Sequence, residues 1–165
     1  MGAGYHGGFG KTLGKIQSEN KEAGTNDSDR VNYISRNEIL RELMGVTIES
    51  TIVATEINDK KISLNILGDK LFDYYVTPDS TVVGRHVDGK IYVRRSSQDL
   101  VSSILHEGIH AIDYNKGIEY DAINSELKAY RAEHAFQKAG RRRIEHATDE
   151  DIRVHVHRNY GRWKK

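Results

Sequence analysis

The sequence predicts an α+β fold in which a small, mostly antiparallel sheet is combined with helices, and three observations favour it. Residues 46–95 are rich in β-branched side chains and contain a strong hairpin signal. Residues 96–160 change to an apolar spacing typical of helices. The chain has 165 residues, which suits one domain with a substantial core. We therefore expect one domain, over residues 31–165.

The first 30 residues differ in composition from the rest of the chain. Seven of the 15 glycines lie in residues 1–24. Glycine-rich segments behave as flexible chain, so we expect residues 1–30 to form a lead without a core. Within it, Gly10-Lys11-Thr12 matches part of a phosphate-binding loop. Tyr5 stands where that pattern needs glycine, so we do not interpret the segment as such a loop.

A short helix is expected to follow Ser35. Ser35 and Glu38 have the spacing of a capping box, in which each side chain accepts a hydrogen bond from the other residue's backbone N–H. Gly45 is expected to end this helix. Its inward side would carry Ile39, Leu40, Leu43 and Met44.

Three to five strands are expected next. Val46–Ile57 is β-branched and rich in threonine, which favours a strand. Apolar residues at 62, 64 and 66 alternate with polar ones, a pattern of period two. Asp88-Gly89 separates Val82–Val87 from Lys90–Arg95 and predicts a tight antiparallel hairpin.

Three helices are expected in the remaining chain. The first begins after Ser96 or Ser97 and extends to about Tyr114, and the second covers about Asp121 to Ala139 and stops at Gly140. The third begins at Thr148, which forms a capping box with Asp151. A strand is the alternative there, because Ile152, Val154 and Val156 alternate with polar residues.

The motif that carries chemistry is His106-Glu107-Gly108-Ile109-His110, inside the first of these helices. Side chains four residues apart project from one face of a helix, so His106 and His110 can bind the same zinc ion. Glu107 lies beside that position and can accept a proton from water bound to the metal. The motif therefore predicts a zinc site with Glu107 as the catalytic residue.

A third protein ligand is needed, and we expect it on the following helix. If the two helices form an antiparallel hairpin, Glu126 lies about as far below the turn as His110 does, roughly 7 Å for each. Asp113, Glu119 and Glu133 are the alternatives. Asp113 could instead orient a ligand histidine through its other ring nitrogen. Tyr130 and Glu133 continue the face of Glu126 and could support the ligands in the same way, with a core position as the alternative for Tyr130.

Several residues are candidates for the side chain that stabilises negative charge in the transition state, and the sequence does not distinguish between them. The candidates are His155, His157, Tyr160 and Arg153. If the chain is a strand there, His155 and His157 could also form a metal-binding pair on one face. The other histidines, His86, His134 and His146, are expected at the surface.

The order of strand, His106–His110 motif and helix with Glu126 and Ala129 resembles the zincin metallopeptidases whose third ligand is a glutamate. The resemblance covers about residues 80–140 and implies a zincin-like fold and zinc-dependent hydrolysis of a protein or peptide substrate. It also implies that an edge strand holds extended substrate, for which Lys90–Arg94 is the candidate.

The small size and the segment Gly7–Thr12 resemble the C-terminal toxin modules of bacterial polymorphic and RHS-repeat effectors. This resemblance implies delivery as part of a larger secreted protein and neutralisation by a cognate immunity protein.

Composition excludes several other classes. The chain has no cysteine, which excludes disulfides, cysteine-ligated zinc and a cysteine nucleophile. No apolar run approaches the roughly 20 residues of a membrane span, and Met1–Gly10 does not have the pattern of a signal peptide. Residues 141–165 carry 8 basic and 4 acidic side chains. Two rival functions remain, a catalytically inactive metal-binding scaffold and a nucleic-acid binder using that basic tail, which we consider the weaker.

Overall fold

The computed structural model describes residues 34–161, so the predicted lead over residues 1–30 lies outside the described residues, as does Gly10-Lys11-Thr12. The described chain is α+β, as predicted. Its elements, in order, are α3 (Arg36–Leu43), α4 (Ile48–Asn58), β1 (Ser63–Leu67), α5 (Asp69–Tyr75), β2 (Gly84–Val87), β3 (Lys90–Arg94), α6 (Leu100–Asn115), α7 (Ala122–Ala139) and α8 (Asp149–Tyr160).

The sheet of the described residues has three strands in the order β1-β3-β2. The predicted hairpin is confirmed, because β2 pairs antiparallel with β3 and the turn residues Asp88 and Gly89 both have positive φ, as a tight hairpin turn requires. However, β1 pairs parallel with β3, so the sheet is mixed rather than mostly antiparallel. The prediction that Lys90–Arg94 is an edge strand is wrong, because β3 lies between the other two strands.

The strand predicted over Val46–Ile57 is also wrong, because most of this segment forms helix α4. Thr47 and Ser50 form a capping box in which each side chain accepts a hydrogen bond from the other's backbone N–H, at 3.0 Å in both directions. Ser50, Val53, Ala54 and Ile57 share one buried face of the helix. Packing of that face outweighs the strand preference of β-branched residues, since intrinsic propensities are small.

The other predicted helices are confirmed. The Ser35 side chain caps the N-terminus of α3, and Gly140 is the C-cap residue of α7. Helix α6 begins later than expected, with Asp99 as its cap. The segment after Thr148 is a helix and not a strand, because Ile152 and Val156, one turn apart, are buried while Val154 is 48% exposed.

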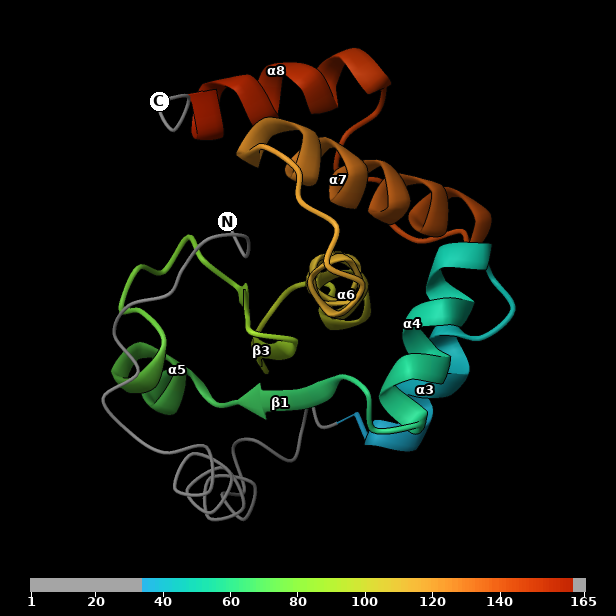
Figure 1. The fold of residues 1–165 in the computed structure, drawn as a ribbon, viewed down its shortest axis with the longest axis vertical. Helices are drawn as coiled ribbons and strands as arrows, with labels where there is room; N and C mark the ends of the chain where they lie inside the picture. The colour runs from blue at the N-terminus through green and yellow to red at the C-terminus, as the bar shows by residue number, and fades with distance from the viewer. Residues whose placement is uncertain (1–33, 162–165) are drawn as a thin grey trace.

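Helix α6 occupies the centre of the molecule. Figure 1 shows α6 end-on, with the sheet on one side, α7 and α8 on another, and α3 and α4 on a third. Helix α6 contacts β2, β3, α4 and α7. Because neighbours surround it, its polar side chains are buried along with its apolar ones, including His106, Glu107 and His110. The predicted metal motif therefore lies in the interior.

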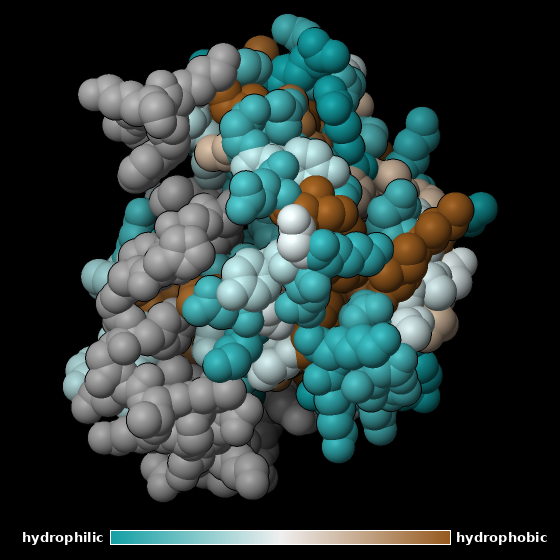
Figure 2. Space-filling view, viewed as in Figure 1, coloured by the Kyte–Doolittle hydropathy of each residue, from teal (hydrophilic) through white to brown (hydrophobic). Residues whose placement is uncertain are grey.

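The face of the molecule seen in Figure 2 is largely hydrophilic, with hydrophobic side chains gathered towards the right of the view, over α4. Ile48 is the most exposed of the large apolar residues described, at 77%. Among the described residues, no helix combines the length and the apolar character that crossing a bilayer requires.

The glycine inside the motif has a packing role. A Cβ atom on Gly108 would lie 2.6 Å from Val53 Cγ1, so α6 approaches α4 as closely as it does only because residue 108 lacks a side chain. We expect Gly108→Ala to lower the free energy of unfolding by about 1–3 kcal/mol through overpacking, although alanine is the better helix former. Urea unfolding measures this change.

A double variant provides the control. Val53→Ala removes both methyl groups that the new Cβ would meet. The cost of Gly108→Ala should therefore be smaller in the Val53→Ala background than in the wild type. Equal costs in the two backgrounds would show that the close approach of α4 does not limit residue 108.

Candidate metal centre

Three buried side chains converge on one point where α6 meets α7. His106 Nε2 lies 3.1 Å from Glu126 Oε2, and His110 Nε2 lies 3.3 Å from Glu126 Oε1. The two Nε2 atoms are 3.3 Å apart. Among the described residues, these three form a group that could hold a metal ion. They are the same three residues that the sequence indicates as ligands.

The spacing of these atoms can be compared with that of a zinc site. Zinc binds histidine nitrogen and carboxylate oxygen at about 2.0–2.2 Å in a tetrahedron, so neighbouring ligand atoms should lie about 3.3–3.6 Å apart. The 3.3 Å between the two Nε2 atoms agrees with this edge length, whereas the 3.1 and 3.3 Å contacts of Glu126 are made by its two different oxygens. One ligand atom from each of the three residues lies within 4.8 Å of the others. If the three residues bound zinc, a fourth position would remain open, as it does in catalytic zinc sites.

The two helices meet in a way that the sequence did not indicate. In Figure 1, α6 is seen down its axis whereas α7 lies across the view, so the helices cross and do not form the antiparallel hairpin assumed for the sequence. Glu126 nevertheless lies at the crossing, because one end of its helix is fixed close to α6 by the short connection that ends at the Asp121 cap. Glu133, two turns further along α7, reaches the other side of His106.

The second nitrogen of each histidine is also engaged. His106 Nδ1 lies 3.1 Å from Glu133 Oε2, and His110 Nδ1 lies 3.0 Å from Ser125 Oγ. Glu133 in turn accepts a hydrogen bond from Gln137 Nε2 at 3.3 Å. These contacts turn both Nε2 atoms towards Glu126, as the partners of metal-bound histidines commonly do.

The three alternative candidates for the third ligand do not reach the point where His106 and His110 converge with Glu126, or contact a different atom of His106. Asp113 accepts a hydrogen bond from Lys128 Nζ at 2.6 Å, whereas the Nδ1 atoms of His106 and His110 contact Glu133 and Ser125 instead. Glu119 is exposed. Glu133 contacts the nitrogen of His106 that faces away from Glu126, so it orients His106. The sequence indicated Glu133 both as an alternative ligand and as a supporting residue on the face of Glu126, and its contact with His106 Nδ1 agrees with the second role.

Glu107 lines the same cleft as His106 and is 5% exposed. Its Oε2 atom is buried and has no hydrogen-bond partner within residues 34–161. A Cβ atom on Gly84 would lie 2.9 Å from Glu107 Cγ, so strand β2 passes directly against this side chain. A buried carboxylate oxygen without a partner is costly, and it fits a position at which a water or substrate atom is to be held.

A cleft of about 370 Å³ opens at this point. The loop before β2, with Asp79, Thr81, Val82 and Val83, forms part of its wall, and Tyr130, His155, Asn159 and Tyr160 form another part. His106 and Glu107 also line the cleft. A substrate in it would contact both the strand edge and helix α8.

Three of the residues predicted near the reaction, Tyr130, His155 and Tyr160, do line the cleft, and Tyr130 lies edge-on to the His106 ring at 4.5 Å between centroids. His157 is exposed on α8, and a helix does not place residues 155 and 157 on one face, so they form no metal-binding pair. Arg153 forms a surface ion pair with Asp149 at 3.0 Å.

The histidines expected at the surface are more buried than predicted. His86 is 6% exposed and its Nε2 accepts a hydrogen bond from the Gly89 backbone N–H at 2.9 Å, inside the hairpin. His134 and His146 are half-buried, with His134 Nδ1 lying 2.7 Å from the His146 carbonyl oxygen. The hairpin backbone contacts the His86 ring, and the chain after α7 contacts the His134 ring. The surface prediction relied on histidine being a polar residue, which does not indicate such tertiary contacts.

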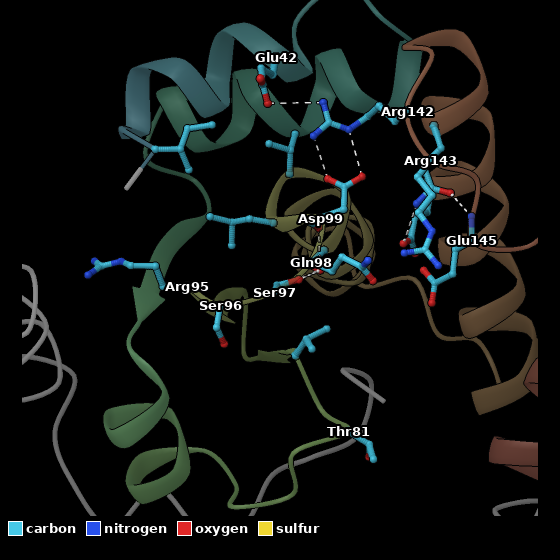
Figure 3. A pocket seen from close by; sticks show the side chains of 17 residues that line it. Glu42, Thr81, Arg95, Ser96, Ser97, Gln98, Asp99, Arg142, Arg143 and Glu145 are labelled. Carbon is cyan, nitrogen blue, oxygen red and sulfur yellow. Dashed lines mark hydrogen bonds and ion pairs between the residues drawn. The ribbon is translucent and has the colours of Figure 1, made fainter. Parts of the chain in front are cut away.

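A larger cleft of about 1130 Å³ continues from the first one. Both clefts are lined by Thr81, Val83, Ser103, Glu133 and Glu145. Figure 3 shows Arg142 extending into this region towards Asp99, to which it donates two hydrogen bonds, at 2.8 and 3.1 Å, and towards Glu42. One of the basic residues after α7 is thus neutralised within the fold.

Electrostatics favour a proton on the ligand cluster when no metal competes. Burial opposes a charge on His106, but hydrogen bonds to Glu126 and Glu133 outweigh it and raise the His106 pKa to about 10. Burial likewise opposes ionisation of Glu126, yet His106 and His110 hold its pKa well below the usual range. Burial raises the pKa of Glu133 to about 7. The cluster is therefore built around at least one negative carboxylate and a cation.

Zinc must displace that proton, which gives a pH prediction. Zinc binds neutral imidazole, so at any pH below the raised pKa of His106 binding releases a proton. The apparent zinc affinity should then rise about tenfold per pH unit and should still be rising between about pH 7 and pH 9. Competition with a fluorescent chelator measures it. A plateau just above the ordinary histidine pKa of about 6.5 would contradict the raised pKa.

No protein-family model, curated protein or solved structure matches this chain.

Proposed function

We propose that this chain is a zinc-dependent metallopeptidase of the zincin type, with His106, His110 and Glu126 as the ligands. One observation carries the proposal: three buried side chains that could hold a metal ion, with ligand atoms within 4.8 Å of one another, accompany a buried carboxylate oxygen of Glu107 that has no partner in residues 34–161. A site that only stored metal would gain nothing from leaving a carboxylate buried and unsatisfied next to it.

The chain's own residues supply the proton transfer. When bound, zinc would polarise the scissile carbonyl and lower the pKa of water in its open position. In this proposal Glu107 accepts the proton of the attacking water and then donates it to the leaving amine, as general base and then general acid. Burial and the close contact with Gly84 hold the Glu107 side chain in one place during both steps.

Strand β2 supports a peptide as the substrate. It pairs on one side with β3 and is an edge of the three-stranded sheet of the described residues, and residues 82–84 line the cleft next to Glu107. An extended peptide can add to such an edge through main-chain hydrogen bonds. This role was expected of Lys90–Arg94, which is the central strand. The larger, adjoining cleft offers room for several residues on one side of the scissile bond.

The rival functions gain less support. A catalytically inactive scaffold would not need Glu107 in its present position. The nucleic-acid reading depends on the basic charge after Gly140, of which Arg142 and Arg153 are engaged in ion pairs within the fold. The proposal that the chain is a bacterial toxin module depends on the glycine-rich segment, which lies outside the described residues.

A peptide library tests the proposal. Zinc-loaded protein is incubated with a mixture of peptides derived from a whole proteome, and new termini are identified by mass spectrometry. We expect cleavage that a chelator abolishes and that added zinc restores. If fully metallated protein generates no new termini, the peptidase function is wrong and the scaffold reading replaces it.

A further inference from the structure

The smaller cleft, which contains the candidate metal centre, has an acidic lining. Its wall includes four carboxyl groups, those of Asp79, Glu107, Glu133 and Glu145. No lysine or arginine occurs among the described residues that line it. Burial, and the nearby charge of a second histidine, lower the pKa of His155, so this ring adds no positive charge at neutral pH. The described lining therefore favours a positively charged ligand over a negatively charged one.

A bound metal would not remove this excess of acidic groups. In the proposed site, the carboxylates of Glu126 and Glu107 would balance the two positive charges of zinc. Glu133 is engaged with the ligands, since its two oxygens contact His106 Nδ1 at 3.1 Å and Gln137 Nε2 at 3.3 Å. Two carboxyl groups of the lining then remain beyond those that the metal centre uses.

The two remaining carboxyl groups differ in their surroundings. Hydrogen bonds from Thr81, and to a smaller extent the charges of two nearby arginines, hold the pKa of Asp79 below its usual value. Within residues 34–161, no lysine or arginine, Arg143 included, forms an ion pair with Glu145. Glu145 is therefore the acidic side chain of the cleft with which a cationic group of a substrate can pair.

Glu145 lies where the smaller cleft meets the larger one, since it lines both. Its backbone N–H donates to Gln137 Oε1 at 3.1 Å, and its side chain is hydrogen-bonded to Glu133. These contacts hold the Glu145 carboxyl group at the junction of the two clefts. Figure 3 shows the side chains of Arg95 and Arg142 extending away from Glu145.

The other residues of this junction suit a long basic side chain. Val83, which is 39% exposed, offers apolar surface, and Thr81 and Ser103 offer hydroxyl groups. Lysine and arginine place their methylene groups along apolar surface and keep the charged end among polar groups. Two carboxyl groups in contact also repel each other when both are ionised, and a cation placed against them relieves that repulsion.

Glu107 indicates independently that a ligand enters the smaller cleft. It is 5% exposed and lines this cleft, and its buried Oε2 atom has no hydrogen-bond partner within residues 34–161. A substrate held at Glu107 reaches the larger cleft past the residues that line both clefts, which include Glu145. A side chain close to the reacting bond can therefore contact Glu145.

We propose that Glu145 is a specificity-determining residue, which selects peptide substrates that carry a lysine or arginine side chain close to the scissile bond. This inference rests on the proposed peptidase function. An acidic side chain in the same position would be repelled by Glu145 and by Asp79, which lines the same cleft. The selection thus combines attraction of one class of substrate with repulsion of another.

Three peptides that differ at one position test the selection. A peptide that the protein cleaves is prepared with lysine, acetyl-lysine or glutamate at the position where the library shows the strongest preference; acetylation removes the charge of lysine. We expect kcat/KM to be highest for lysine and lowest for glutamate, and the advantage of lysine over acetyl-lysine to shrink at high salt. If the wild type cleaves the three peptides equally well, or prefers glutamate, this inference is wrong while the proposed function stands. A metallated wild type that cleaves no peptide refutes the proposed function and this inference with it.

Charge reversal at residue 145 assigns the selection to one side chain. An exposed ion pair contributes up to about fivefold, and Glu145→Lys replaces attraction by repulsion for one peptide and repulsion by attraction for the other. At equal zinc occupancy, the ratio of kcat/KM for the lysine peptide to that for the glutamate peptide should therefore fall at least about tenfold, and Glu145→Gln should lower it less.

Glu150→Lys is the matched control, because Glu150 is exposed on α8 and lines neither cleft, so this variant should retain the wild-type ratio. Equal changes in Glu145→Lys and Glu150→Lys would show that the net charge of the protein decides the preference, and would overturn the assignment to Glu145.

Discussion

Glu126→Ala is expected to abolish tight zinc binding. The variant removes one of three converging ligand atoms and leaves two histidine nitrogens 3.3 Å apart with no carboxylate between them. Loss of a group that only hydrogen-bonds to a ligand costs about 10- to 100-fold in metal affinity, so loss of the ligand itself should cost more than 100-fold. Competition against a chelator of known affinity measures the change.

Two neighbouring glutamates provide graded controls. Glu133→Ala removes the partner of His106 Nδ1 and should weaken zinc binding about 10- to 100-fold. Glu119→Ala alters an exposed residue and should leave the affinity unchanged. If Glu133→Ala lost more affinity than Glu126→Ala, the assignment of ligand and orienting residue would have to be exchanged.

Glu107→Gln is expected to lower peptidase activity by at least about 100-fold, the lower end for the loss of general acid–base catalysis. Glutamine has the same size as glutamate, so it fits against Gly84, but its amide cannot accept a proton at neutral pH. Glu107 contributes no ligand atom to the cluster, so zinc content should not change. Thermal stability should not fall, because the substitution removes a buried charge.

The comparison must be made at equal zinc occupancy. His106→Ala is the contrasting variant, because it removes a ligand and should lose zinc, activity and the stabilisation that bound metal gives by mass action. A fully metallated Glu107→Gln protein that cleaves peptides as fast as the wild type would exclude Glu107 as the catalytic base.

Local signals in the sequence predicted much of this fold. The Asp88-Gly89 turn and the capping residues Ser35 and Thr148 each lead to the expected element, because turn and cap chemistry involves only neighbouring residues. The spacing of His106 and His110 gave their common face for the same reason. The strand predicted over Val46–Ile57 was wrong, because the burial of one face of α4 decides the structure of this segment. That burial depends on elements far along the chain.

The remainder of the site depends on tertiary arrangement. Strand β1 pairs with β3, although α5 and β2 lie between them in the chain, and this pairing makes β3 central and β2 an edge of the sheet. The crossing of α6 and α7 brings Glu133 to His106, which an antiparallel hairpin does not suggest. The hydrogen bond between Tyr130 and His155 joins α7 to α8, and the spacing of residues within either helix does not reveal it.

The metal content of the purified wild-type protein tests the central claim most directly. The cluster of His106, His110 and Glu126 provides one set of ligands, so elemental analysis after supply of zinc and removal of loosely bound metal should give about one zinc per chain. A protein that retains no transition metal under these conditions would contradict the metal centre and the peptidase function built on it.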